Sequence, residues 1–129
     1  MVGVKNKNKV KQILIVEDDK DMQEIYEDMF GDERDYKVDI VDRAAEALRK
    51  LQEKNYHLVI LDIIMEPVTG DSLFLYIRAD KKTKETPVLV VSVLSPVTME
   101  KLKRINHIDF LQKPISRGQL IEKIEKMTK

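Results

Sequence analysis

The stretch ILIVEDD at residues 13–19 places three acidic side chains directly after a short apolar run. Three later stretches repeat the arrangement of polar residues at the end of an apolar run: LVILD at 58–62, VLVVS at 88–92 and IDFLQKP at 108–114. Short continuous apolar runs are typical of strands that are buried on both faces of a parallel sheet. In open α/β sheets, ligands bind beyond the carboxyl ends of the strands. The four stretches therefore predict a single site made of carboxylates, a hydroxyl and a lysine.

Strand and helix patterns alternate along the chain. A fifth strand-like run covers 38–41, and apolar residues at helical spacing follow every strand. Gly31 and Asn106 are placed to end helices, and Ser95 and Ser116 are placed to begin them. Five strands and five helices in strict alternation predict an α/β fold, a (βα)₅ doubly wound parallel sheet of the flavodoxin-like type with strand order 2-1-3-4-5. The clearest helical stripe, which we expect to pack in the core, is Met22, Ile25, Tyr26, Met29 and Phe30.

Length and composition favour one domain without a membrane segment. A chain of 129 residues with 43% hydrophobic residues can bury one core. It has no cysteine, which excludes both a disulfide framework and a thiolate metal site. The apolar runs are too short to cross a bilayer, and the polar start of the chain has no signal-peptide core. We expect a cytoplasmic protein, with no membrane insertion and with a flexible basic tail at residues 1–11.

Charge is balanced overall but unevenly placed. Residues 17–35 carry ten acidic and two basic side chains, whereas residues 101–129 carry eight basic and three acidic ones. Such asymmetry can steer partners, although solvated helix faces give the same pattern. Nucleic-acid binding by the lysines of the tail has little support, and we expect no direct contact with nucleic acid.

The residues at the strand ends suit phosphoryl transfer. Asp62 would be the acceptor, while Glu17 and Asp18 would hold Mg²⁺, which prefers oxygen ligands. Ser92 and Lys113 would contact the phosphoryl oxygens. Each residue alone has an ordinary explanation, because acids pair with helix N-termini and Asp or Lys-Pro often forms turns. Together, at successive strand ends, they predict a functional site.

The chain resembles the receiver domain of bacterial two-component response regulators over about residues 12–127, and we assign residues 12–129 to this domain. The motifs that carry the resemblance are Glu17-Asp18, Asp62 with Gly70 eight residues later, Ser92, and Lys113-Pro114 with Phe110 before it. The resemblance implies that Asp62 accepts a phosphoryl group from the phosphohistidine of a histidine kinase. It further implies Mg²⁺, or Mn²⁺ as a substitute, bound directly by Asp18 and Asp62, by Glu17 through water, and by the main-chain carbonyl of Ile64.

The resemblance also implies a two-state switch. Ser92 would move onto the phosphoryl group while Phe110 turns inward, which would remodel the face made by the helix after Ser95, the strand at 108–111 and the last helix. The Lys113–Pro114 peptide bond is expected to be cis, which proline makes accessible.

Three positions depart from the family pattern. Glu66 stands where the family has proline, and Pro67 follows it, which puts an extra carboxylate near the site. Val93 stands where alanine is usual, so we expect slower phosphorylation by small donors and slower hydrolysis. Asn106-His107 replaces a common Gly-Ala, which points to a different shape of the output face. His57 and His107 are themselves read as structural or surface residues.

The sequence favours a stand-alone phospho-accepting switch, an expectation that rests on chain length. Its partners would be a sensor histidine kinase or histidine phosphotransfer protein and an unknown downstream protein, with the chain monomeric or weakly dimeric on phosphorylation. We expect no enzyme beyond its own phosphotransfer and autodephosphorylation. A phosphatase with an aspartyl-phosphate intermediate would need a second aspartate at the position of Ile64. An inactive scaffold conflicts with the intact site, and a nucleotide-binding module would need a glycine-rich loop.

Overall fold

The computed structural model describes residues 10–62, 70–93 and 107–129. Its five strands form one parallel sheet in the order β2-β1-β3-β4-β5. The predicted fold class and strand order are therefore confirmed. The strands are β1 (Lys11–Val16), β2 (Tyr36–Val41), β3 (Leu58–Leu61), β4 (Val88–Ser92) and β5 (Ile108–Gln112).

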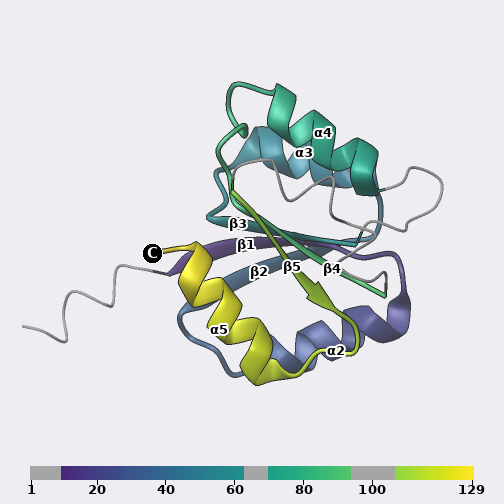
Figure 1. Cartoon of the computed structure of the whole chain (residues 1–129), viewed down its shortest axis with the longest axis vertical. Coiled ribbons are helices and arrows are strands. Elements are labelled where there is room, and N and C mark those ends of the chain that lie inside the picture. The colour runs from purple at the N-terminus through teal and green to yellow at the C-terminus, as the bar shows by residue number, and fades with distance from the viewer. Residues whose placement is uncertain (1–9, 63–69, 94–106) are drawn as a thin grey trace, which may run out of the picture.

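Helices cover both faces of this sheet. Figure 1 shows α3 and α4 above it and α2 and α5 below it. The fifth predicted helix, which would follow Ser95, lies outside the described residues, as does Asn106. The described helices are α2 (Lys20–Phe30), α3 (Ala44–Glu53), α4 (Gly70–Ala79) and α5 (Arg117–Met127).

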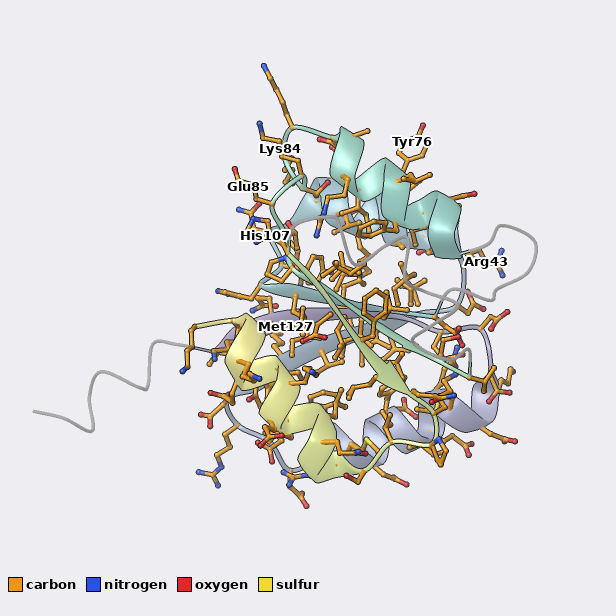
Figure 2. All side chains as sticks on the ribbon, viewed as in Figure 1. Arg43, Tyr76, Lys84, Glu85, His107 and Met127 are labelled. Atoms are coloured by element: carbon orange, nitrogen blue, oxygen red, sulfur yellow. The ribbon has the colours of Figure 1, made fainter. Side chains whose placement is uncertain are left out.

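The pleat of the strands divides the core into two clusters, and side chains fill the space on each side of the sheet (Figure 2). Successive residues of a strand point to opposite faces. Leu14 and Val16 thus pack in the cluster that includes α3 and α4, while Ile13 and Ile15 pack in the cluster that includes α2 and α5. The two faces account for the continuous apolar runs in the sequence, because both sides of each inner strand are buried.

Polar caps fix where two helices begin. Asp19 accepts a hydrogen bond from the Met22 main-chain N–H at 2.9 Å and caps α2. Ser116 caps α5 as predicted, and it forms a capping box with Gln119 in which each side chain bonds the other residue's main-chain N–H. These bonds satisfy N–H groups that the first turn of a helix leaves unpaired.

Three expectations need correction. β1 begins at Lys11, whose N–H donates to the Asp35 carbonyl at 2.9 Å, so this residue belongs to the sheet and not to the tail. β2 begins at Tyr36, two residues before the predicted run. Ile25 was expected in the core but is 44% exposed, because α2 turns only Met22, Tyr26 and Phe30 fully inward.

At the amino-terminal end of β4 and β5, a half-buried arginine of α4 is held by carbonyl oxygens. Arg78 donates to the carbonyls of Thr86 and His107, both at 2.8 Å, and more distantly to that of Thr83. Its guanidinium also lies over the ring of Phe74, 5.0 Å from the centroid. Burial lowers the pKa of Arg78 from its ordinary value. This residue therefore ties α4 to the loop before β4 and to the start of β5.

His107, just before β5, has a positive φ of 63°. This left-handed conformation is uncommon for residues other than glycine. Its carbonyl accepts two hydrogen bonds, from Arg78 and from the Val88 N–H at 2.8 Å. His107, which we expected to be a structural or surface residue, thus contributes to the fold through its main-chain carbonyl.

Among the described residues, none of the helices has the length and apolar character needed to cross a membrane.

Candidate functional site

The register of the sheet pairs the four predicted strand ends, β1 with β3 and β4 with β5. Val16 of β1 pairs with Leu61 of β3, so Glu17 and Asp62, the residues that follow, leave the sheet side by side. On the neighbouring strands, the Lys113 N–H donates to the Ser92 carbonyl at 2.8 Å. Ser92 is the last residue of β4 and is fully buried. Parallel pairing alone therefore gathers the polar residues that the sequence singled out.

Lys113 joins the two carboxylates. Its Nζ lies 2.8 Å from Asp62 Oδ2 and 3.1 Å from Glu17 Oε1. Both acids are buried, with Glu17 only 1% and Asp62 8% exposed. The ammonium group is therefore the shared counter-charge of two carboxylates that water barely reaches. The peptide bond between Lys113 and Pro114 is cis, as expected.

Burial and ion pairing have opposite effects on the pKa values of Glu17 and Lys113. Burial raises the pKa of Glu17, and the hydrogen bond and charge of Lys113 only partly offset this effect. For Lys113, burial acts to lower the pKa, but the bonds to Asp62 and Glu17 outweigh it and the pKa is raised. The lysine is therefore held in its charged form, and two buried acids share a single positive charge.

The metal prediction rests on these acids and on Asp18, which is half-buried. Glu17 is fixed from both sides: its Oε2 accepts the Asp19 N–H at 3.2 Å, and its carbonyl accepts the Gln23 amide at 2.6 Å. Within residues 10–62, 70–93 and 107–129, no group of three or more His, Cys, Asp or Glu side chains is assembled to hold a metal ion. The donors present are carboxylate oxygens that already converge on a cation, which fits a hard ion such as Mg²⁺.

Three predicted positions after β3 lie outside the described residues, and the fourth begins the next helix. Ile64, whose carbonyl was expected to bind metal, lies outside the described residues, and so do Glu66 and Pro67. Gly70, the last of the four, is the first residue of α4.

The predicted switch residues, Ser92 and Phe110, lie on the face of the sheet that α3 and α4 cover. Val88, Val90 and Phe110 pack in the cluster that includes α3 and α4, and strand alternation assigns Ser92 to the same side. Phe110 is 9% exposed, so the ring is already turned inward in this structure. The helix after Ser95, the third part of the expected output face, lies outside the described residues.

An apolar hollow that the sequence did not reveal adjoins the site. It has a volume of about 270 Å³ and is lined by side chains of α2, of the segment after β4 and of the segment after β5. Two of its apolar side chains are exposed, Val93 to 62% and Ile25 to 44%. Ile25 continues the apolar stripe of α2, so periodicity alone could not separate it from the core. The lining residues are Met22, Ile25, Val93, Lys113, Pro114 and Ile115.

Comparison with known proteins gives the class of this fold and site. Residues 13–125 match the response regulator receiver domain, and the chain belongs to this family. Within it, the chain resembles the chemotaxis protein CheY of Pseudomonas aeruginosa, with 31% identity over 124 residues that cover 90% of this chain and 94% of CheY. The protein is thus a CheY-like receiver domain of two-component signalling, a signalling module.

Solved structures share this fold. A sensor protein from Polaromonas sp. JS666 superposes with a TM-score of 0.82 at 27% identity, covering 92% of this chain and 95% of that one. The receiver domain of the sensor histidine kinase PA1611 from Pseudomonas aeruginosa, which has a magnesium ion coordinated in its active-site cleft, superposes with a TM-score of 0.81 at 23% identity, covering 92% of this chain and 97% of that one. The chain spans only about half of two other curated relatives, 50% of one and 48% of the other.

Proposed function

We propose that Asp62 accepts a phosphoryl group from the phosphohistidine of a sensor histidine kinase or a histidine phosphotransfer protein. Receiver domains take phosphate from histidine kinases and act on downstream targets. The observation that carries the proposal for this chain is the buried Asp62 carboxylate, 2.8 Å from an ammonium group that remains charged. A carboxylate in this position already faces positive charge, which favours its role as an aspartyl nucleophile.

The chemistry follows from the residues present. An oxygen of Asp62 attacks phosphorus, the P–N bond breaks, and the imidazole keeps the electron pair of that bond and leaves. Lys113 then exchanges its contact with the carboxylate for one with a phosphoryl oxygen. Glu17, Asp18, Asp62 and the Ile64 carbonyl would hold Mg²⁺, or Mn²⁺ in its place. When bound, the metal supplies charge that neutralises the transferring phosphoryl group.

Partner docking is supported by the apolar hollow beside the site. Exposed apolar surface next to a reactive group is typical of protein interfaces. We assign the hollow lined by Ile25 and Val93 to the protein that delivers the phosphohistidine. The output would pass through Ser92 and Phe110, which share one face of the sheet, to an unknown protein partner. The chain would act in the cytoplasm without binding nucleic acid, as a monomer or as a weak dimer once phosphorylated.

Labelling with a small phosphodonor tests the acceptor. With phosphoramidate and Mg²⁺, the wild-type chain should gain one phosphoryl group by intact mass, and Asp62→Asn should gain none. Asp80→Asn is the matched control, because Asp80 lies at the end of α4 outside the site. Chelation of the metal should abolish labelling. Undiminished labelling of Asp62→Asn would refute the acceptor, and sustained hydrolysis of phosphate esters would instead indicate a phosphatase.

Val93 offers a second test of the same site. Its side chain is 62% exposed in the hollow beside Lys113. Val93→Ala should speed both phosphorylation by phosphoramidate and autodephosphorylation, because a smaller side chain opens the approach to Asp62. Intact mass measures the rate at which the phosphoryl group is gained and the rate at which it is lost. Unchanged rates would show that Val93 does not limit access to Asp62.

A further inference from the structure

Gln23, in the first turns of α2, is bonded to the acidic turn at residues 17–19, although the sequence pattern assigned it no role. Its side-chain amide donates to the Glu17 carbonyl at 2.6 Å, and its main-chain N–H donates to the Asp19 carbonyl at 3.0 Å. These two carbonyls belong to the residues on either side of Asp18. One glutamine therefore holds the main chain both before and after an acid that we expect to bind the metal.

The Glu17 carbonyl lies where the sheet ends. Glu17 directly follows Val16, the last residue of β1, and is only 1% exposed. A main-chain carbonyl that water barely reaches needs a hydrogen-bond donor from the protein. The side-chain amide of Gln23 supplies one, so its loss would leave this part of the acidic turn less firmly held.

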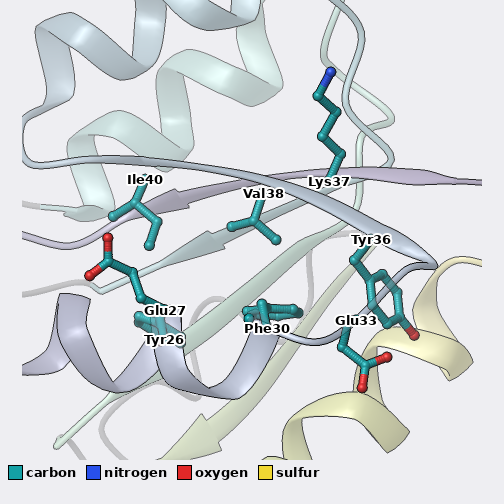
Figure 3. A pocket seen from close by; sticks show the side chains of 9 residues that line it. Tyr26, Glu27, Phe30, Glu33, Tyr36, Lys37, Val38 and Ile40 are labelled. Carbon is teal, nitrogen blue, oxygen red and sulfur yellow. The ribbon is translucent and has the colours of Figure 1, made fainter.

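The helix that carries Gln23 is itself packed against the sheet. Its rings Tyr26 and Phe30 are 1% and 7% exposed. Figure 3 shows both rings beneath Val38 and Ile40 of β2, and the four side chains belong to one core cluster. Close packing of this kind leaves a helix little freedom to shift. Gln23 thus links the acidic turn to an element whose position the core determines.

The donor at position 23 is also neutral. Glu17 and Asp62 already share the positive charge of Lys113. An arginine or lysine at position 23 could donate to the same carbonyl, but it would add a second fixed positive charge beside the acids. Like charges repel, so that charge would oppose the binding of a divalent cation. A glutamine amide holds the main chain without this cost.

We propose that Gln23 is a positioning residue, which sets Asp18 in the orientation that binds the divalent cation. This role rests on the proposed function, because it requires that the acids hold Mg²⁺ or Mn²⁺. Gln23 does not touch the metal or the phosphoryl group and acts through the main chain around Asp18. Loss of a group that orients a metal ligand typically weakens metal binding by 10- to 100-fold, and we expect about tenfold here.

Direct metal binding tests this role without any phosphodonor. Gln23→Met keeps the length of the side chain and removes its donor. Electron paramagnetic resonance measures the free Mn²⁺ that remains in a titration, and the Kd of Gln23→Met should be about tenfold above that of wild type. The matched control is Gln52→Met, which removes an amide bond of 2.9 Å to Asp80 away from the site and should keep the wild-type Kd.

A lysine at the same position separates the hydrogen bond from the charge. Gln23→Lys keeps a long donor, so its Kd for Mn²⁺ should exceed that of wild type mainly through repulsion. The ratio of the two Kd values should therefore fall between 0.1 M and 1 M salt, where the screening length drops from about 10 Å to about 3 Å. The ratio for Gln23→Met should be the same at both salt concentrations.

Phosphorylation gives a second readout. With phosphoramidate, Gln23→Met should need about tenfold more Mg²⁺ for half-maximal labelling, while its rate at saturating Mg²⁺ should remain that of wild type. A merely structural role would lower the midpoint of urea unfolding and leave the Mn²⁺ Kd of the folded chain unchanged.

An unchanged Mn²⁺ Kd in Gln23→Met, or an equal rise in Gln52→Met, would overturn the role of Gln23 and leave Asp62 as the acceptor. Absence of Mn²⁺ and Mg²⁺ binding in the wild-type chain would overturn both. The two failures are distinguishable, because metal binding is measured without a phosphodonor.

Discussion

A half-buried cation ties elements together at each end of the sheet, but the groups that balance the two charges differ. At the carboxyl end, Lys113 is held by two carboxylates, those of Glu17 and Asp62. At the amino end, Arg78 is held by main-chain carbonyls, including those of Thr86 and His107, and no described carboxylate pairs with it.

Because of this difference, the contacts of Lys113 can change when a ligand binds, whereas those of Arg78 only stabilise the fold. Carboxylates can exchange a lysine for a metal ion or accept a phosphoryl group, so the balance of charge around Lys113 depends on what is bound. Carbonyl oxygens neither titrate nor react, and their geometry belongs to the backbone. We therefore expect changes at Lys113 to depend on ligand, and changes at Arg78 to affect stability alone.

Removal of the lysine should have the largest effect. Without Mg²⁺, Lys113→Met should lower the free energy of unfolding by about 3 kcal/mol, because two buried carboxylates lose their counter-charge. Urea denaturation measures the loss, and Mg²⁺ should recover part of it. The control is Lys123→Met, which removes a more exposed pair with Asp109 and should cost about 0.5 kcal/mol. Equal losses in the two variants would mean that burial of the acids contributes nothing.

Removal of Arg78 should lower the free energy of unfolding somewhat less, and this loss should not depend on Mg²⁺. Arg78→Met removes the side-chain donor of the Thr86 carbonyl and one of the two donors of the His107 carbonyl, at an expected cost of about 2 kcal/mol. Mg²⁺ should not recover this loss, and the rate at which Asp62 is labelled should remain that of wild type once the variant is folded. Metal-dependent recovery in Arg78→Met would show that the two ends of the sheet are coupled.

The smallest effect is expected at His107, and it is stabilising. His107→Gly removes the Cβ that opposes a φ of 63°, a relief that outweighs the added freedom of the unfolded chain by about 0.5 kcal/mol. Thermal unfolding should show a small rise in Tm. His107→Ala, which removes the imidazole but keeps the Cβ, should show no such rise, and a rise in both variants would trace the effect to the imidazole.

The sequence predicted the fold and much of the site because their signals are local. Glu17, Asp62, Ser92 and Lys113 each follow an apolar run, and parallel strands bring such positions to one edge. The contacts of Lys113 with both acids are a direct result of that topology.

Features that depend on long-range packing were not predicted. Arg78 has the sequence context of a surface residue of a helix, and only the approach of the loop before β4 partly buries it. Likewise, the stripe that includes Ile25 has a period that fits a buried face, and only the packing of α2 on the sheet decides which members stay exposed. Neither property is encoded within a few residues of the position concerned.

The strand order has a consequence for how the protein assembles. β2, β1 and β3 are neighbours formed by the first half of the chain, whereas β4 and β5 are added in turn at one edge. A sheet that lacked its last strand would still bring Glu17 and Asp62 together, because both follow strands of this first group. It would lack Lys113, whose ammonium group the two carboxylates share. Pairing of β5 with β4 therefore completes the charge balance of a site that β1 and β3 begin.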